Sequence, residues 1–245
     1  ETIADLKTLH AWWGSACAVT PRFALSASEE IMAMLGAYAR QHSLLVQTHL
    51  AENTDESAEV RRTYPKARSY ADVYDRAGLL TARTILAHCI QLDEADWRLL
   101  AERQCVVAHC PQSNLALRSG RMDIDACRRH GVDWVLASDV GAGRELCGFA
   151  TIQAFLEQHQ GKARVSVAEA FAHTVVNAVP RRLLPPDTPA MLMTLRPDRN
   201  MANAEEYLSA LMDAWRHRHT SGGWVFNNIS IFGTNLRTYG PDEHP

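Results

Sequence analysis

Short apolar runs alternate with amphipathic stretches along most of this chain. Five of these runs have the length of a strand and are apolar on both faces, at residues 17–23, 44–50, 84–90, 105–111 and 132–140. Strands that bury both faces are typical of parallel sheets covered by helices. The pattern therefore predicts an α/β fold in which strands and helices succeed one another.

Amphipathic stretches that predict helices follow the strands, at residues 26–42, 55–62 with 69–78, 93–103, 122–131 and 148–160. In the first of them, the spacing of Ser26 and Glu29 predicts a capping box at the helix start. The same stretch places Ile31, Leu35 and Tyr38 on one face, which we expect to be buried.

The alternation ends after residues 166–178, which predict one more helix. A proline-rich connector follows, then another amphipathic stretch and a tail rich in glycine, asparagine and aromatic residues. We therefore expect two parts, a β/α part over residues 1–180, and a connector, an amphipathic helix and a tail over residues 181–245.

Polar residues stand at the C-terminal ends of the predicted strands, namely His49, His88, His109 and Asp139. Active sites of β/α barrels collect at that end of the strands, and doubly wound sheets also bind ligands there. No GxGxxG motif follows any of these strands, so nothing favours a dinucleotide-binding fold.

Metal-assisted hydrolysis requires side chains that bind a cation, a base for the attacking water and an acid for the leaving group. His49, His88 and Asp139 are suitable ligands, and Glu52 is suited to carry a proton. Each residue also has a structural explanation: a hydrogen-bonded histidine, an aspartate that organises a turn, or a glutamate favoured at a helix start. The joint arrangement favours the chemical explanation.

Composition narrows the class of protein. The net charge of −3 gives no basic surface for a phosphate backbone, so a nucleic acid polymer is not an expected partner. The six cysteines form no CxxC pair, which favours reduced thiols and a cytoplasmic location. No apolar run is long enough to cross a bilayer, and the first residues lack the order of a signal peptide.

Several stretches resemble the motifs of the guanine deaminase family, within the amidohydrolase superfamily. They are "TPRFALSASEE", "VQTHLAENTDE", "YPKARSYADVYDRAGLLTARTILAHCI", "AHCPQSNLALRSG" and "ASDVGAG". They occur in the order and with the spacing of that family, over residues 12–143. The resemblance implies a (β/α)8 barrel and hydrolytic deamination of guanine to xanthine and ammonia.

The resemblance also implies roles for single residues. His49 matches a zinc ligand, and Asp139 matches the aspartate that binds the metal and deprotonates the attacking water. His88 matches the histidine that faces the metal and supports the oxygen of the tetrahedral adduct. Glu52 matches the proton shuttle, and one Zn²⁺ ion per active site is implied.

Arg22 and Phe23 match the pair that holds guanine, beside His49, Glu52 and Asp139 in the substrate site. A guanidinium suits the O6 and N7 acceptors of guanine, and an aromatic face stacks on a base. Without the other motifs, a turn proline followed by a surface cation and a core phenylalanine would explain the PRF stretch. The resemblance gives His109 and Cys110 no metal role, so we expect both to pack and hydrogen-bond.

The chain departs from the family at its start. The family's HxH motif at the end of strand one, which supplies two of its zinc ligands, is absent, so the chain would supply strands four to eight. His49 and Asp139 alone are expected to bind zinc weakly, because zinc sites use three or four protein ligands. The HxH at His217 and His219 ends a helical pattern, where the two side chains diverge. In "GRELCGF", Arg144 and Glu145 also depart from the family.

Three explanations of the partial match stay open: a fragment of a longer enzyme, a mispredicted or decayed gene product, and a truncated relative kept for binding or assembly. An open half-barrel exposes two strand edges, which predicts association, for example as a homodimer. The alternatives to guanine deamination are another amidohydrolase acting on an aminated heterocycle, and a catalytically silent oligomerising homologue.

Overall fold

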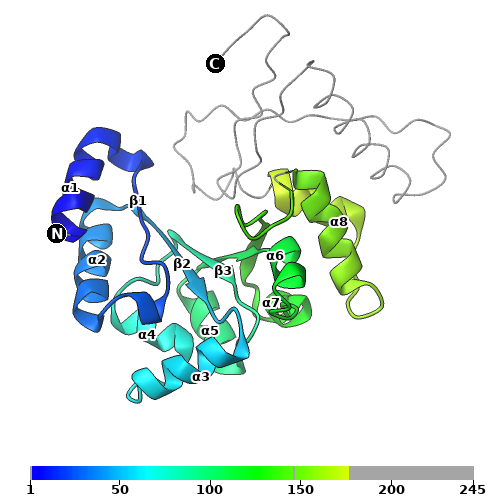
Figure 1. The fold of residues 1–245 in the computed structure, drawn as a ribbon, viewed down its shortest axis with the longest axis horizontal. Coiled ribbons are helices and arrows are strands. Elements are labelled where there is room, and N and C mark those ends of the chain that lie inside the picture. Colours follow the sequence, from blue (N-terminus) through cyan, green and yellow to red (C-terminus); the bar gives the residue numbers. More distant parts are fainter. Residues whose placement is uncertain (1, 146, 177–245) are drawn as a thin grey trace, which may run out of the picture.

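The computed structural model describes residues 2–145 and 147–176, and Figure 1 shows their fold. The predictions for residues 181–245, including those for His217 and His219, lie outside this described part.

One parallel sheet organises the described residues, and its strand order β1-β2-β3-β4-β5 follows the chain. The strands are β1 (Ala18–Val19), β2 (Leu45–Leu50), β3 (Thr84–His88), β4 (Val106–His109) and β5 (Asp133–Leu136). Every neighbouring pair is parallel, as between Leu50 and His88. The predicted α/β class and the five parallel strands are confirmed.

Helices connect the strands, as the sequence pattern predicts. The helices are α1 (Thr2–Trp13), α2 (Glu29–His42), α3 (Thr54–Thr63), α4 (Tyr70–Arg76), α5 (Glu94–Glu102), α6 (Pro111–Ala116), α7 (Ile124–His130), α8 (Gly148–His159) and α9 (Val167–Phe171). The sequence pattern did not predict α1 or α6. Pro111 occupies the first position of α6, where its missing N–H costs no helical hydrogen bond.

Strand side chains alternate between two buried layers. One layer packs against the helices, and its strand members include Val46, Leu86, Val107 and Trp134. The other layer lies on the opposite face of the sheet, and its strand members include Leu45, Ile85, Val106 and Val135. Burial on both faces explains why these strands are apolar throughout.

Helix α2 starts later than its sequence predicts. The N-cap is Ser28, whose side chain accepts a hydrogen bond from the backbone N–H of Ile31. Ser26 instead closes a preceding 3₁₀ turn, because its hydroxyl donates to the Phe23 carbonyl and accepts from the Phe23 N–H. The predicted capping box of Ser26 and Glu29 is therefore wrong, although the helix itself is confirmed.

The first strand is shorter than the predicted run of residues 17–23, because pairing with β2 covers only Ala18 and Val19. Pro21 has no N–H to donate to a ladder, and the chain turns into the 3₁₀ segment after Phe23. Within the described part, every helix is too short or too polar to traverse a bilayer.

The central strand offers a test of the two-layer core. Leu86 on β3 is fully buried, whereas Leu117 after α6 is 57% exposed. We expect Leu86→Ala to lower the free energy of unfolding by about 2–5 kcal/mol, through lost burial and the cavity left behind. The control Leu117→Ala should change it by less than about 0.5 kcal/mol. Urea unfolding measures both, and equal losses would contradict the burial of Leu86.

Candidate metal centre

Three side chains from three strand ends form one group. His49 at the end of β2, His88 at the end of β3 and Asp139 after β5 each offer a ligand atom, and these atoms lie within 4.8 Å of one another. The His49 and His88 rings stack with their centroids 5.2 Å apart. The Oδ2 atom of Asp139 lies 3.9 Å from Nε2 of His88. Parallel strands bring these residues together because their C-terminal ends share one edge of the sheet.

His49 is held by the backbone of Arg22. Its Nδ1 lies 2.8 Å from the Arg22 carbonyl oxygen, which can only accept, so Nδ1 carries the hydrogen. The backbone N–H of His49 and the hydroxyl of Thr48 also donate to this carbonyl. The ring is therefore fixed in orientation and tautomer, and its Nε2 presents a lone pair to a metal.

His88 is held in the same way by a side chain. Its Nδ1 lies 3.0 Å from Oδ1 of Asn114 on α6, and both residues are buried. With Nδ1 as donor, neutral His88 presents a lone pair at Nε2, which favours a ligand role. To donate a hydrogen bond to an adduct oxygen through Nε2, the ring would have to be protonated.

The backbone of His88 explains how its side chain reaches the group. Strand alternation alone would place His88 in the helix-facing layer with Leu86. Its φ of 71° is left-handed and so breaks the alternation, as does the φ of 52° at Cys89. Such conformations of non-glycine residues cost about 1–3 kcal/mol and cluster at functional sites.

Asp139 both organises a turn and belongs to the ligand group. Its φ is 53°, and its carbonyl accepts hydrogen bonds from the N–H groups of Ala142 and Gly143. A Cβ at Gly143 would lie 1.9 Å from the Ser138 carbonyl oxygen, so only glycine fits there. The turn explanation thus describes the backbone of Asp139 and leaves its carboxylate available.

Glu52 lies beside this group. Its Oε2 is 3.7 Å from Nε2 of His88, and its Oε1 accepts a hydrogen bond of 3.3 Å from the hydroxyl of Ser119. Helix α3 begins after the N-cap Asn53, so Glu52 lies outside its first turn. The carboxylate of Glu56 fixes the backbone of Glu52 by accepting from its N–H. A role as a helix N-terminal carboxylate therefore falls to Glu56, which leaves Glu52 free for the site.

Arg22 lies next to His49 in space, because its carbonyl accepts hydrogen bonds from His49, and Phe23 follows Arg22 in the chain. The Arg22 guanidinium carbon is 5.5 Å from the centroid of the Phe23 ring. Arg22 is exposed and Phe23 is half-buried, so both can meet a ligand. Their contact with a base stays a prediction.

His109 points away from the metal group, although it shares the sequence Ala-His-Cys with His88. Its Nε2 lies 3.1 Å from Nε2 of His159 on α8, and its ring meets Phe155 edge-on. Cys110 lies in the layer opposite the helices, and its thiol donates to the Ala108 carbonyl. Both residues pack and hydrogen-bond within the core.

The donor set fits a divalent cation. Two imidazole nitrogens and one carboxylate match a catalytic zinc site, which takes three protein ligands and keeps one position open. Both histidines have hydrogen-bonded partners for their second nitrogen, as metal-binding histidines usually have. Within the part of the chain that the structure describes, these three residues form the cluster of histidine, cysteine or acidic side chains that could hold a metal ion.

Sequence reasoning missed the supporting residues Asn114 and Ser119. Both lie in the stretch "AHCPQSNLALRSG", which resembles a family motif but for which the sequence pattern predicted no helix. The available sequence signal was the polar run Gln112, Ser113 and Asn114 directly after a strand. These side chains are buried in α6, and buried polar groups need hydrogen-bond partners. Arg144 is exposed, and the backbone of Glu145 is held by the Gln112 side chain.

Comparison with known proteins supports a common origin. The amidohydrolase family model matches residues 4–179. Guanine deaminase of Mus musculus is 42% identical over 125 residues, which cover 51% of this chain and 28% of that protein. The chain therefore spans less than a third of the length of this relative.

Solved structures show the same likeness. E. coli guanine deaminase matches with a TM-score of 0.68 and 34% identity, over 71% of this chain and 43% of that one. Guanine deaminase from C. acetobutylicum, solved with guanine bound in its active site, matches with a TM-score of 0.66 and 32% identity, over 72% and 45%. These matches confirm the barrel-type amidohydrolase fold and its partial extent here.

The Asn114 hydrogen bond generates one prediction. Asn114→Ala keeps all three ligands but removes the acceptor that orients His88, so we expect zinc affinity to fall about 10–100-fold. The control Gln153→Ala removes an exposed amide on α8 and should leave the affinity unchanged. Competition with a chromophoric chelator measures both, and unchanged affinity in Asn114→Ala would remove Asn114 from the metal site.

The buried histidine pair generates a pH prediction. Burial lowers the pKa of His159 to about 4, helped by Arg121, and burial also holds the pKa of His109 far below its usual range. In the unfolded chain both titrate near 6.5. Between about pH 6.5 and pH 4 the unfolded state thus binds more protons, so the free energy of unfolding falls as the pH falls.

The expected slope is up to about 1.4 kcal/mol per pH unit for each histidine. His159→Gln should flatten the dependence over this window, whereas the exposed control His42→Gln should not. Urea unfolding at several pH values tests this. A pH dependence that is identical in the wild type and His159→Gln would contradict the depressed pKa.

Proposed function

Because this chain belongs to the amidohydrolase family, we propose that it serves the hydrolytic deamination of guanine, in which water and guanine give xanthine and ammonia. The guanine deaminases that it resembles support this substrate. Such a reaction belongs to purine catabolism.

The group of His49, His88 and Asp139 beside Glu52 is the observation that carries the proposal. It combines a metal-binding donor set with two carboxylates, from Asp139 and Glu52, that lie 3.9 and 3.7 Å from the same imidazole nitrogen. Hydrolysis of an aminated ring needs a nucleophilic water and proton transfers in both directions. These residues supply the groups for both.

His49, His88 and Asp139 would hold a zinc ion. When bound, zinc supplies Lewis acidity that makes water nucleophilic near neutral pH. Asp139 accepts a proton from the water that attacks carbon C2 of guanine. His49 keeps its lone pair toward the site through its bond to Arg22.

Glu52 moves the proton. In its protonated form it gives a proton to a ring nitrogen of guanine as C2 becomes tetrahedral. It then takes the proton of the new hydroxyl group on C2 and passes it to the amino group, which leaves as ammonia, and the proton that Asp139 accepted from water restores the protonated form of Glu52. The Ser119 hydroxyl and the backbone contact with Glu56 hold the carboxylate in place for this transfer. A general acid–base group of this kind contributes about 10²–10⁴ to a rate.

Arg22 and Phe23 would hold the base. A guanidinium can donate to O6 and N7 of guanine together, and this pairing discriminates by about 1–3 kcal/mol. The Phe23 ring offers a stacking face, and the Arg22 cation beside it strengthens the attraction for a π system.

We also propose a cytoplasmic location and a homodimer. The six cysteines are all buried and form no disulfide, which suits a reducing compartment. Within the described sheet, β1 and β5 are edge strands, and a second copy would cover an open edge.

Metal analysis together with an ammonia assay tests the proposed function. We expect zinc in a one-to-one ratio with the chain and ammonia release from guanine. Zinc without ammonia release would instead support the catalytically silent homologue, since the chain spans less than half of the solved relatives. A panel of other aminated heterocycles separates a different amidohydrolase from a guanine deaminase.

Glu52→Gln tests the proton path in an active preparation. The substitution keeps the size of the side chain and removes its ability to carry a proton, so we expect deamination to fall about 10²–10⁴-fold. Zinc content should not change. Glu157→Gln, at an exposed carboxylate on α8, is the matched control. Full activity of Glu52→Gln would remove Glu52 from the mechanism.

A further inference from the structure

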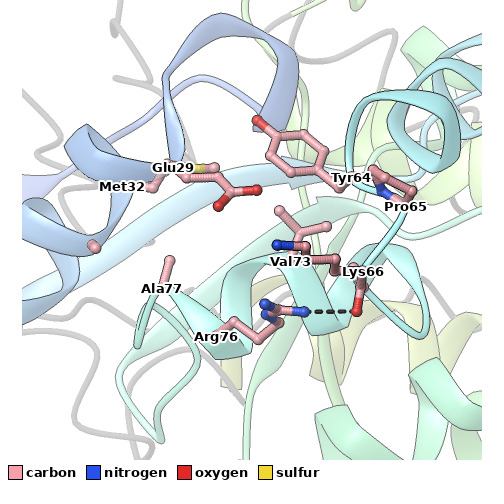
Figure 2. A pocket seen from close by; sticks show the side chains of 10 residues that line it. Glu29, Met32, Tyr64, Pro65, Lys66, Val73, Arg76 and Ala77 are labelled. Atoms are coloured by element: carbon pink, nitrogen blue, oxygen red, sulfur yellow. Dashed lines mark hydrogen bonds between the residues drawn. The ribbon is translucent and has the colours of Figure 1, made fainter.

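A second candidate site lies in the helical layer. A cavity of about 280 Å³ opens between α2, α4 and the link that joins α3 to α4 (Figure 2). Helix α2 contributes Glu29 and Met32, one turn apart, and helix α4 contributes Val73 and Arg76 at the same spacing. Residues three apart lie on one face of a helix, so each helix contributes two side chains of one face to the cavity wall.

The floor of this cavity is apolar. Met32 is fully buried, and Val73, Ala77 and Tyr64 are each less than a tenth exposed. The Tyr64 hydroxyl is occupied, because it donates to the Ala24 carbonyl at 2.7 Å. The floor therefore offers a small apolar contact area, mainly from Tyr64, Val73 and Ala77, for an aliphatic group of a ligand.

The rim of the cavity is charged. Glu29, Lys66 and Arg76 are all exposed, and Figure 2 shows the Glu29 carboxylate and the Arg76 guanidinium on facing walls. Arg76 is held against the loop, because its Nη1 donates to the Lys66 carbonyl at 2.6 Å. Burial raises the pKa of Tyr64, and the nearby Glu29 carboxylate raises it further, which places that charge next to the floor.

The charged groups of Glu29, Lys66 and Arg76 on the rim form no salt bridge with one another or with neighbouring side chains of the described residues. The two carboxylates of α4 nearest to Arg76 in sequence have other partners, since Asp72 pairs with Arg68 and Asp75 pairs with Arg103. Within the described residues, no salt bridge within 4.0 Å involves Arg76, Lys66 or Glu29, although Arg76 lies close enough to Asp72 for their charges to interact. The rim thus presents two cations and one anion to a ligand.

The cavity is separate from the metal centre. Its floor residues Met32, Tyr64 and Val73 belong to the core layer between the sheet and the helices. None of the residues that line it belongs to the group of His49, His88 and Asp139. A ligand bound here would not compete with a base at the metal centre.

We propose that this cavity binds an aliphatic α-amino acid. The carboxylate of the ligand meets Arg76 and Lys66, its ammonium group meets Glu29, and its side chain covers Met32, Val73 and Ala77. The rim offers charges of both signs, so both the carboxylate and the ammonium group of a zwitterion can make charge-assisted hydrogen bonds there. The small volume suits a single amino acid better than a peptide.

Isothermal titration calorimetry of the whole chain with L-leucine tests the proposal. We expect saturable binding of leucine, and affinities at least about tenfold weaker for 3-methylbutylamine, which lacks the carboxylate, and for 4-methylpentanoate, which lacks the ammonium group. Binding of 3-methylbutylamine as tight as that of leucine would show that the carboxylate is not recognised, and would overturn the proposal.

Variants locate the binding site. Arg76→Gln and Ala33→Trp, the second of which fills the mouth of the cavity, should each weaken leucine binding about tenfold or more. Arg98→Gln, at an exposed arginine on α5, should not weaken it. His49→Ala should also bind leucine normally, which separates this cavity from the metal centre.

Circular dichroism of each variant shows whether it has folded. Absence of leucine binding to the folded wild type would overturn the proposal. Binding that survives both Arg76→Gln and Ala33→Trp would place leucine elsewhere and overturn it as well.

Discussion

The left-handed backbone of His88 determines which strand-end histidine serves the site. In a parallel sheet, side chains alternate strictly, so residues of one parity face the helices and those of the other face the opposite side. His88 and His109 occupy the same parity in two copies of Ala-His-Cys, and each would face the helices. Only His88 has a positive φ, and only His88 joins the metal group. His109 keeps the regular conformation and pairs with His159 in the core. The strain at His88 persists because its ring is anchored to Asn114 within a buried setting.

The carbonyl of Arg22 links the metal centre to the proposed base-binding segment. It accepts hydrogen bonds from the backbone and the ring of His49 and from the hydroxyl of Thr48. Any shift of Arg22 would therefore disturb the tautomer and the orientation of His49, a proposed metal ligand. Tyr64 fixes the same segment from the other side through the Ala24 carbonyl. The residues proposed to bind the base and those proposed to bind the metal are thus positioned by one hydrogen-bonded unit, which helps to hold the reacting atoms at a fixed separation.

Sequence pattern predicted most of this architecture, because apolar runs and helix periodicity report directly on burial. The rule that parallel strands end at a common edge placed His49, His88, His109 and Asp139 together. The resemblance to guanine deaminases added Glu52 to the site and gave His109 no metal role. The sequence pattern erred where two residues of the same type compete for one role, since Ser26 and Ser28 are equally good caps and only the turn at Phe23 decides between them. It also could not distinguish His88 from His109 by position, because a backbone dihedral that tertiary contacts impose leaves no periodic signal. Asn114 was missed for a related reason: its partner lies 26 residues away on another element.

The candidate metal group is built from a shorter part of the chain than a complete barrel would need. His49 and His88 come from the ends of β2 and β3, and Asp139 comes from the turn after β5. Their orienting partners Arg22 and Asn114 lie in the same described segment. The three residues proposed to bind an ion and the partners that orient them therefore all lie within the described segment. We expect deamination to require more of the protein than this segment. The solved relatives are more than twice as long as the region that matches. An enclosed site also strengthens every charge interaction within it. We therefore expect metal affinity and turnover to be separable properties of this scaffold. We expect a chain that holds zinc through His49, His88 and Asp139 to catalyse the reaction only if its surroundings exclude bulk water and still admit the single water that attacks guanine.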